Sequence, residues 1–296
     1  MRRVQIIGAG AVGLLVASFL AESKWDVQLV CRRQQQVKLL NSNLKRENAS
    51  GDFLEVNVKA STTICNDVDI TIVALKSGQL QKLIHKLPKH IPTIFLQNGL
   101  AHYDLVSSLS WHNVAFGSAQ FGALKVADNV VSHRGVGVLK LAYIDDAVSG
   151  NFLKPFLDIG NENFPVLLED NAERMLMEKA IYNSLINPLT ALLHLTNGEL
   201  LTNNHAYNLL KRIHTELAQC FPDESPSFGE VVALCERTAF NTSSMLSDHL
   251  MKKKSEAPAI LGALIERAEK KCVQLYTLKT IYELLLAKEL QEEFII

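Results

Sequence analysis

One lysine and two asparagines in the second half of the chain have the spacing needed to line one side of a helix. Lys179, Asn183 and Asn187 recur every fourth residue within a mostly apolar stretch. At about 100° per residue, they share one narrow stripe with Thr190 and His194. A largely apolar helix is buried over most of its surface, so a charge and two amides on it should face a polar cavity. The alternative is that the stripe simply faces water.

Lys179 is the residue of this stripe best suited to proton transfer. Hydride reduction of a 2-oxo acid creates an alkoxide, which needs a proton. A partly desolvated lysine has a lowered pKa and can supply that proton, while its charge stabilises the developing oxyanion. The two asparagines offer donors and acceptors for a carboxylate and a hydroxyl. His194 is an alternative acid, but it lies about four turns from Lys179, and we favour a structural role for it.

The start of the chain carries glycines at the spacing of a dinucleotide-binding fingerprint. The apolar run 4–7 ends at Gly8, and Gly10 and Gly13 complete a G-x-G-x-x-G pattern before an apolar helical segment. Gly8 permits a tight turn, Gly10 lets a pyrophosphate approach the backbone, and Gly13 lets the helix pack closely on the strand. The helix start would then hold the phosphates. A turn that binds no phosphate is one alternative, and a secretory signal peptide is another.

Arg32 and Arg33, at the end of the next predicted strand, indicate which dinucleotide would bind. In NAD-binding proteins an acidic residue near this point bonds the ribose 2′-hydroxyl, whereas an arginine accommodates a 2′-phosphate. After the strand 25–31 the acid is missing, and two guanidiniums stand in its place. The pattern favours NADPH, although a pair of surface arginines would look the same. The strand also weakens the signal-peptide interpretation, since a βαβ unit needs its first strand and helix.

Alternating strands and helices predict an α/β fold with a doubly wound parallel sheet in the first part of the chain. We expect strands at 53–58, 69–75, 92–96, 114–122, 136–143 and 164–168, and a polar loop over 41–50. Ligands of such sheets bind beyond the carboxyl ends of the strands, where Lys76 and Asn98 follow. Both are also ordinary turn residues. Residues 130–133 are expected to pair with 136–143 and extend the sheet.

Long helical segments predominate from residue 171 onwards, which predicts an all-helical second domain. Helices are expected over 171–195, 230–240 and 276–293, with another beginning near Ser255. Pro188 predicts a kink in the first of these, because it lacks the backbone N–H of the helix ladder. The predicted domains are an NADP-binding Rossmann-type domain over 1–168 and a helical substrate and catalytic domain over 169–296.

Composition and charge narrow the classes of function. The chain has 296 residues and a formal net charge of −1, and its longest basic run is 252–254, so we expect no nucleic-acid partner. No apolar run is long enough to cross a membrane. Five scattered cysteines without C-x-x-C spacing argue against a disulfide framework or a zinc site and for a reducing compartment. The expectation is a cytoplasmic protein without a metal site, either a monomer or a homodimer.

Taken together, these features resemble the ketopantoate reductase (2-dehydropantoate 2-reductase) family over the whole chain. The resemblance is carried by the glycine turn with Arg32, and by Leu75–Lys76, 97–99, 178–179, Asn183, 186–191, 197–200, 241–246 and Glu256. The asparagine-proline helix and the serine pair are more specific than the glycine turn. The resemblance implies an NADPH-dependent oxidoreductase of pantothenate biosynthesis that reduces 2-dehydropantoate to pantoate.

The resemblance also implies roles for individual residues, with Lys179 as the catalytic proton donor. It implies NADPH contacts for Gly8, Ala9, Gly10, Ala11, Val12, Gly13, Arg32, Lys76, Asn98, Ala123 and Glu256. It implies substrate contacts for Asn98, Lys179, Asn183, Asn187, Asn197, Asn241, Thr242, Ser243 and Ser244. The site would lie between the two domains.

The chain departs from the family pattern in two places. The region 219–230 is short, which predicts a trimmed helix there. Residues 257–262 read Ala-Pro-Ala-Ile-Leu-Gly, where the family often has a polar-aromatic stretch that ends in Asn-Gly. This second departure leaves two alternatives to 2-dehydropantoate reduction. One is reduction of another small branched 2-oxo acid, and the other is a catalytically idle NADPH-binding sensor, against which the presence of Lys179 speaks.

Overall fold

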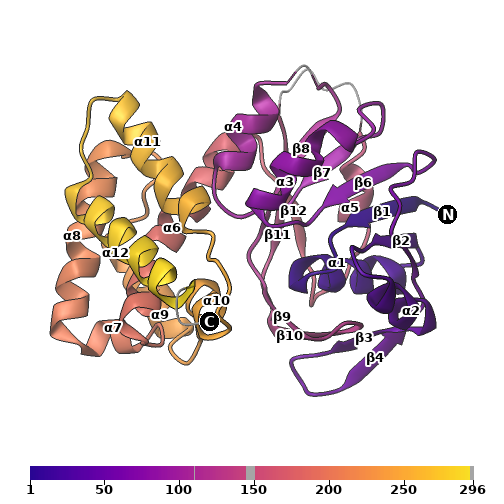
Figure 1. The fold of residues 1–296 in the computed structure, drawn as a ribbon, viewed down its shortest axis with the longest axis horizontal. Helices are drawn as coiled ribbons and strands as arrows, with labels where there is room; N and C mark the ends of the chain where they lie inside the picture. Colours follow the sequence, from indigo (N-terminus) through magenta and orange to yellow (C-terminus); the bar gives the residue numbers. More distant parts are fainter. Residues whose placement is uncertain (110, 145–150, 294–296) are drawn as a thin grey trace. The chain divides into compact units, whose positions relative to one another are not determined.

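The computed structural model describes residues 1–109, 111–144 and 151–293, which form two compact units (Figure 1). Unit 1 comprises residues 1–97 and 102–175, and unit 2 comprises 98–101 and 176–296. Unit 1 contains all the strands of the described chain, while unit 2 is helical. The α/β fold with a helical C-terminal part is thereby confirmed. The assignment of NADP binding to 1–168 and of catalysis to 169–296 stays a prediction.

The main sheet of unit 1 has eight strands within the described ranges, in the order β12-β11-β8-β7-β6-β1-β2-β5. These strands are β1 (Arg3–Ile7), β2 (Asp26–Val30), β5 (Lys59–Ser61), β6 (Ile70–Val73), β7 (Thr93–Phe95), β8 (Val114–Ala119), β11 (Leu139–Tyr143) and β12 (Val166–Leu168). Neighbours run parallel apart from β8 and β11, which are antiparallel. From β5 to β8 the order is that of the doubly wound sheet, and β6 and β7 are buried throughout, as parallel strands covered on both faces should be.

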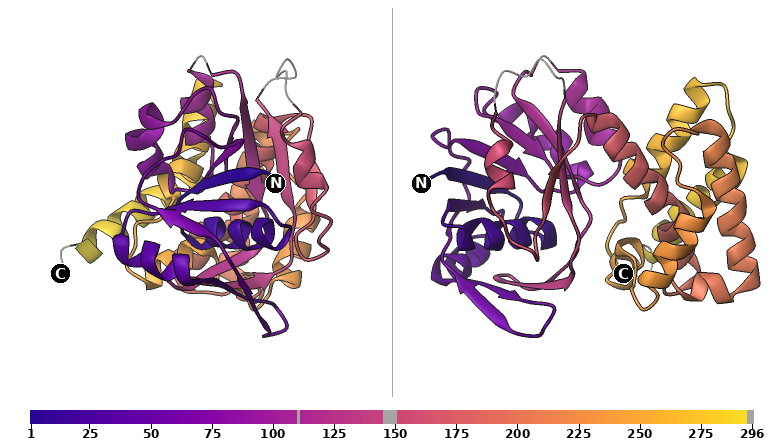
Figure 2. Two further views of the ribbon diagram at one scale, coloured as in Figure 1. Left: turned by 90° about the vertical axis from the view of Figure 1, so that its right-hand side faces the viewer. Right: turned by 180° about the vertical axis from the view of Figure 1, so that it is seen from behind.

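Short helices connect the strands of unit 1 (Figure 2). They are α1 (Ala11–Glu22), α2 (Gln34–Ser42), α3 (Ser77–Leu83) with a 3₁₀ turn (Ile84–Lys86), α4 (Ala101–Ser107) and α5 (Lys154–Leu157). Helix α1 is buried along residues 13–20, because it packs on β1 and β2 and also contacts a second, smaller sheet. That double coverage explains why its sequence is apolar on nearly every side.

The smaller sheet of unit 1 corrects two predictions. Its strands β3 (Leu44–Glu47), β4 (Phe53–Val56), β9 (Gly122–Ala127) and β10 (Val130–Gly135) follow the order β4-β3-β10-β9. The predicted loop over 41–50 is wrong, because it contains β3. The predicted pairing of 130–133 with 136–143 is also wrong, since β10 pairs with β9 and β3, and β11 joins the main sheet. Burial on α1 explains the arrangement: the ring of His133 meets Phe19, with centroids 5.5 Å apart.

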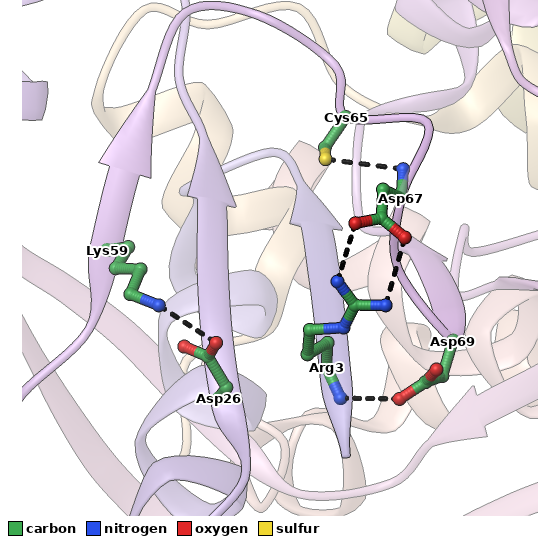
Figure 3. Close-up of polar contacts among 6 residues, drawn as sticks. All are labelled: Arg3, Asp26, Lys59, Cys65, Asp67 and Asp69. Carbon is green, nitrogen blue, oxygen red and sulfur yellow. Dashed lines mark hydrogen bonds and ion pairs between the residues drawn. The ribbon is translucent and has the colours of Figure 1, made fainter. Parts of the chain in front are cut away.

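Ion pairs at the amino ends of β1 and β2 match each cation with a carboxylate (Figure 3). The Arg3 guanidinium donates to both oxygens of Asp67 at 2.7 and 3.0 Å, and its backbone N–H donates to Asp69 at 2.7 Å. Lys59 pairs with Asp26 at 2.8 Å. The Arg3 hydrogen bond is the main reason that the pKa of Asp67 is lowered. Each of these two cations thus has a carboxylate partner, and Asp69 adds one further negative charge, so this group of residues carries no excess of positive charge. Surface ion pairs of this kind contribute little to stability.

Unit 2 is built around α6 (Ala172–Leu193), which begins in unit 1 and confirms the predicted helix over 171–195. The other helices are α7 (Glu199–Thr202), α8 (Asn204–Cys220), α9 (Phe228–Arg237), α10 (Ser244–Leu250), a π-helical turn (Pro258–Gly262), α11 (Ala263–Lys270) and α12 (Tyr276–Glu293). A capping box between Ser227 and Glu230 starts α9. No helix of the described chain is long and apolar enough to span a membrane.

Candidate functional site

The glycine turn joins the end of β1 to α1 and leaves an open backbone surface. Gly8 has a φ of +113°, and a Cβ there would lie 2.7 Å from the carbonyl oxygen of Ala74. A Cβ on Gly13 would lie 1.9 Å from the oxygen of Gly8, so helix and strand approach too closely for a side chain. A Cβ on Gly10 would meet nothing within 4 Å. Gly10 precedes α1 without a side-chain cap, so backbone N–H groups of the first turn face the open side.

The arginines at the end of β2 differ in their surroundings. Arg33 forms an ion pair with Asp128, which also pairs with Lys125 at 2.9 Å. Arg32 is exposed, and its guanidinium makes no hydrogen bond or ion pair with any residue that the structure describes. Arg32 is therefore the arginine whose fork can take a phosphate without losing a partner. Sequence reasoning missed Lys125 and Asp128, because β9 was not predicted.

The other sequence-predicted cofactor residues of unit 1 lie on two elements. Lys76 is exposed and is the residue that precedes α3, just beyond the end of β6. Since β6 lies next to β1 in the sheet, Lys76 and the glycine turn follow neighbouring strands at the point where the strand order reverses. Ala123 is half-buried in β9 and pairs with His133 in β10.

The polar residues of the α6 stripe are buried or half-buried, apart from His194. Asn187 is 8% exposed and Thr190 is fully buried, and Thr190 Oγ1 donates to Ser243 Oγ at 2.7 Å. Lys179 and Asn183 are half-buried. His194 does not continue the stripe: it has a φ of 56°, is exposed, and its ring contacts the Lys288 ammonium at 2.8 Å.

Lys179 has the properties of a proton donor. Desolvation by the surrounding protein lowers its pKa to about 8, although the Glu256 carboxylate partly opposes the shift. Some of the side-chain surface remains exposed, but desolvation still makes the charged form of the ammonium costly. A pKa near neutrality lets the same group be protonated in one step and deprotonated in another.

Asn98 is held next to the partner of this lysine. Its Nδ2 donates to Glu256 Oε2 at 2.8 Å, across 158 residues of sequence. The following turn is fixed to the π-helical segment: the N–H of Leu100 donates to the Ala259 oxygen at 2.9 Å. Gly99 has a φ of +79°, and a Cβ on it would lie 2.1 Å from the same oxygen. Unit 2 therefore gathers Asn98, Glu256 and Lys179 from three distant parts of the chain.

The remaining predicted substrate residues lie in the segments between α6 and the start of α10, and two of them are hydrogen-bonded to each other. The backbone N–H of Asn197 donates to the backbone carbonyl oxygen of Asn241 at 3.2 Å, and its Nδ2 donates to Thr238 Oγ1 at 2.9 Å. Its Oδ1 is buried and has no hydrogen-bond partner among the described residues. Ser243 is buried and caps α10, whereas Thr242 and Ser244 are exposed like Asn241.

Comparison with known proteins identifies the family. The model of the family Ketopantoate reductase PanE/ApbA matches residues 4–146, and that of its C-terminal part matches residues 171–289. The 2-dehydropantoate 2-reductase of Bacillus subtilis (strain 168) is 34% identical over 285 residues, 95% of each chain. That of Archaeoglobus fulgidus is 30% identical over 275 residues, 91% of this chain and 92% of that one. This chain belongs to the ketopantoate reductase family.

Solved structures agree with that membership. A crystal structure of a probable 2-dehydropantoate 2-reductase from Bacillus subtilis matches with a TM-score of 0.85 and 32% identity, over 97% of this chain and 99% of that one. A ternary structure of D-mandelate dehydrogenase with NADH and anilino(oxo)acetate shares the fold, with a TM-score of 0.86 at 22% identity over 98% and 99% of the two chains. The chain is thus an oxidoreductase, and NADPH is the cofactor of its family. The open backbone at Gly10 and the exposed Arg32 fit that cofactor.

Proposed function

We propose that this enzyme reduces 2-dehydropantoate to pantoate with NADPH, with Lys179 as the proton donor. The observation that carries the proposal is the lowering of the Lys179 pKa to about 8, on a stripe shared with two amides and beside Glu256. The names of the curated relatives support the choice of substrate. The product would enter the synthesis of pantothenate and coenzyme A.

The glycine turn of unit 1 would hold the cofactor. Backbone N–H groups at the start of α1 would bind the pyrophosphate, and Arg32 and Lys76 would bind phosphate oxygens. Ala123, Asn98 and Glu256 are the further cofactor contacts that we propose. When bound, NADPH supplies the hydride that reduces the ketone carbon.

Lys179 would act on the substrate oxygen. At neutral pH the ammonium is mostly protonated, and it would donate a hydrogen bond to the ketone oxygen. As negative charge develops on that oxygen, the ammonium stabilises the charge and transfers its proton. Glu256, which opposes the lowering of the lysine pKa, would keep the donor charged before the reaction. Its hydrogen bond would also fix the Asn98 amide.

The amides of unit 2 would bind the rest of the substrate. Asn183 and Asn187 offer N–H donors to a carboxylate from the same face of α6 as the lysine. The buried, unpartnered Oδ1 of Asn197 is an acceptor that a substrate hydroxyl would satisfy. The segment Asn241–Ser244 would complete the binding groups, with Ser243 also linked to α6 through Thr190.

The test is a substrate panel with the purified enzyme. NADPH absorbance is followed with 2-dehydropantoate and with other 2-oxo acids of similar size. Preference for 2-dehydropantoate, expressed as kcat/KM, is the expected result. If that compound is not turned over while another 2-oxo acid is, the substrate assignment is wrong but the chemistry stands. If no 2-oxo acid consumes NADPH, the assignment of a reductase site is wrong.

Reduction of another small branched 2-oxo acid is a second candidate. The observation that favours it is the π-helical turn Pro258–Gly262, where an apolar segment replaces the family's polar-aromatic stretch. This segment also accepts the hydrogen bond that fixes the turn after Asn98. A shared fold with a D-mandelate dehydrogenase is consistent with such a change of substrate. The same panel distinguishes the two candidates when it includes branched 2-oxo acids that lack the terminal hydroxyl of 2-dehydropantoate.

A further inference from the structure

Three cations gather beside the glycine turn. Arg32 and Arg33 follow β2, and Lys125 comes from β9, more than 90 residues further along the chain. The acid bonded to this group is Asp128, which pairs with Arg33 and Lys125. Four charges thus sum to +2, in contrast with the balanced pairs at the amino ends of the strands. An unbalanced positive cluster at a surface points to an anionic ligand.

The Lys125 ammonium is fixed at the glycine turn itself. Its Nζ lies 3.4 Å from the carbonyl oxygen of Ala9, the residue between the first two glycines. Gln36 makes a second link, because its Nε2 donates to the backbone carbonyl oxygens of Ala9 at 3.0 Å and of Asp128 at 2.9 Å. The end of the β9–β10 hairpin is therefore fastened to the turn by two side chains. The lysine side chain stays 29% exposed, so part of it remains open to a ligand.

We propose that Lys125 is a further NADPH-binding residue, which contacts the 2′-phosphate together with Arg32 and is positioned by Asp128. The inference rests on the proposed function, since it takes NADPH as the cofactor. With the pyrophosphate over Gly10, the adenosine ribose would lie between the glycine turn and the end of β2. Arg32 follows β2 and Lys125 belongs to β9, so the two cations would reach the 2′-phosphate from two elements.

The donor capacities of the three cations support this assignment. Arg33 is already bonded to Asp128, whereas Arg32 has no bonded partner in the described chain. An ammonium carries three protons, of which Lys125 directs one to Asp128 and one towards Ala9, so a third is left for the ligand. A phosphate monoester carries a charge of about −1.5 to −2 at neutral pH, which matches the excess of the cluster.

The experiment measures dissociation constants of NADPH and NADH by the change in fluorescence on binding. Lys125→Ala should weaken NADPH binding about tenfold, the loss of one charge-assisted contact, and should leave NADH binding within about twofold. Lys125→Arg should recover most of the NADPH affinity. The matched control is Lys45→Ala, which removes another paired lysine from the same small sheet and should change neither constant.

The possible outcomes separate this inference from the proposed function. Equal weakening of both cofactors by Lys125→Ala, or no weakening of either, would overturn the role of Lys125 at the 2′-phosphate. Retained NADH binding in the variant shows that it is folded. If the unaltered enzyme binds NADPH no more tightly than NADH, the cofactor in the proposed function is wrong, and the inference falls with it.

Discussion

The two arginines beside the glycine turn and the lysine of α6 differ in how far water solvates their charges. Arg32 and Arg33 are exposed and Lys125 is partly so, whereas Lys179 is desolvated enough for its pKa to fall to about 8. A cation that binds a phosphate needs only its charge, which water helps to maintain. A cation that must release a proton needs a charged form that is not too stable. Exposure therefore distinguishes the two arginines of unit 1 from the proton donor of unit 2, whereas Lys125 is half-buried like that donor.

Lys179→Arg gives the largest expected effect, because it keeps the charge but replaces the ammonium with a group far too weakly acidic to donate a proton. An arginine stays protonated at any working pH, so it can hold the substrate oxygen but cannot supply a proton. We expect kcat to fall by about 10²- to 10⁴-fold, the usual contribution of a general acid. The NADPH dissociation constant should not change. Near-normal turnover in this variant would show that charge alone suffices at this position.

Arg32→Ser tests the exposed cations of unit 1, which we expect to bind phosphate. Loss of a charge-assisted phosphate contact should weaken NADPH binding by about 10- to 100-fold, with little change for NADH. Arg33→Ser is the matched control and should have a smaller effect, since that guanidinium is already bonded to Asp128. A larger effect at Arg33 than at Arg32 would reverse the assignment of the 2′-phosphate. Titration of each variant with both cofactors measures the difference.

The pH dependence of the reaction reports the state of Lys179. The donor is the protonated form, which exists below the lysine pKa, so reductive kcat/KM should fall as the pH rises through about 8. Oxidation of the hydroxy acid needs the deprotonated form and should rise over the same range. Glu256→Gln removes the carboxylate that raises this pKa and should move the fall to lower pH. A profile that does not move would separate Glu256 from the titration of the lysine.

Asp67→Asn, at the amino ends of the strands, gives the smallest expected effect. Arg3 and Asp67 form an exposed pair whose two charges cancel, unlike the positively charged cluster at the glycine turn. Cofactor affinity and turnover should therefore not change. Arg3 lowers the pKa of Asp67, so any stabilisation by the pair is present above pH 3.8 and is lost as the pH falls through the folded-state value. Thermal melts of both proteins at neutral and acidic pH check this. A change in NADPH affinity would break the distinction between balanced and unbalanced clusters.

Patterns within short stretches of the sequence were enough to predict the long helices. Helix α6 and the helix Tyr276–Glu293 were expected within two residues of their ends. For α6 the signal was a long, mostly apolar stretch whose polar residues recur with the helical period. Strand β3 was missed, since Leu44–Glu47 reads as polar and becomes a strand only by pairing with β10 and β4. Propensity carries no information about such distant partners.

The same limit applies to the candidate site. The glycine turn and the stripe on α6 are visible because their members lie a few residues apart. The contact of Lys125 with Ala9 spans 116 residues and has no local pattern. The kink expected at Pro188 stays a prediction, although the proline does lie inside a continuous helix. The substrate and cofactor roles of the individual residues also stay predictions until the variants are measured.

The turn at Asn98–Ala101 has a consequence for how the protein is made. These four residues belong to unit 2, although the chain on either side of them belongs to unit 1. Their partners Glu256 and Ala259 leave the ribosome more than 150 residues later. A nascent chain that has completed the sheet therefore still lacks the groups that hold this turn. Any product that ends before residue 256, by premature termination or by proteolysis, lacks the Glu256 carboxylate that holds the Asn98 amide. A fragment that contains only one of these two residues therefore cannot have an intact site.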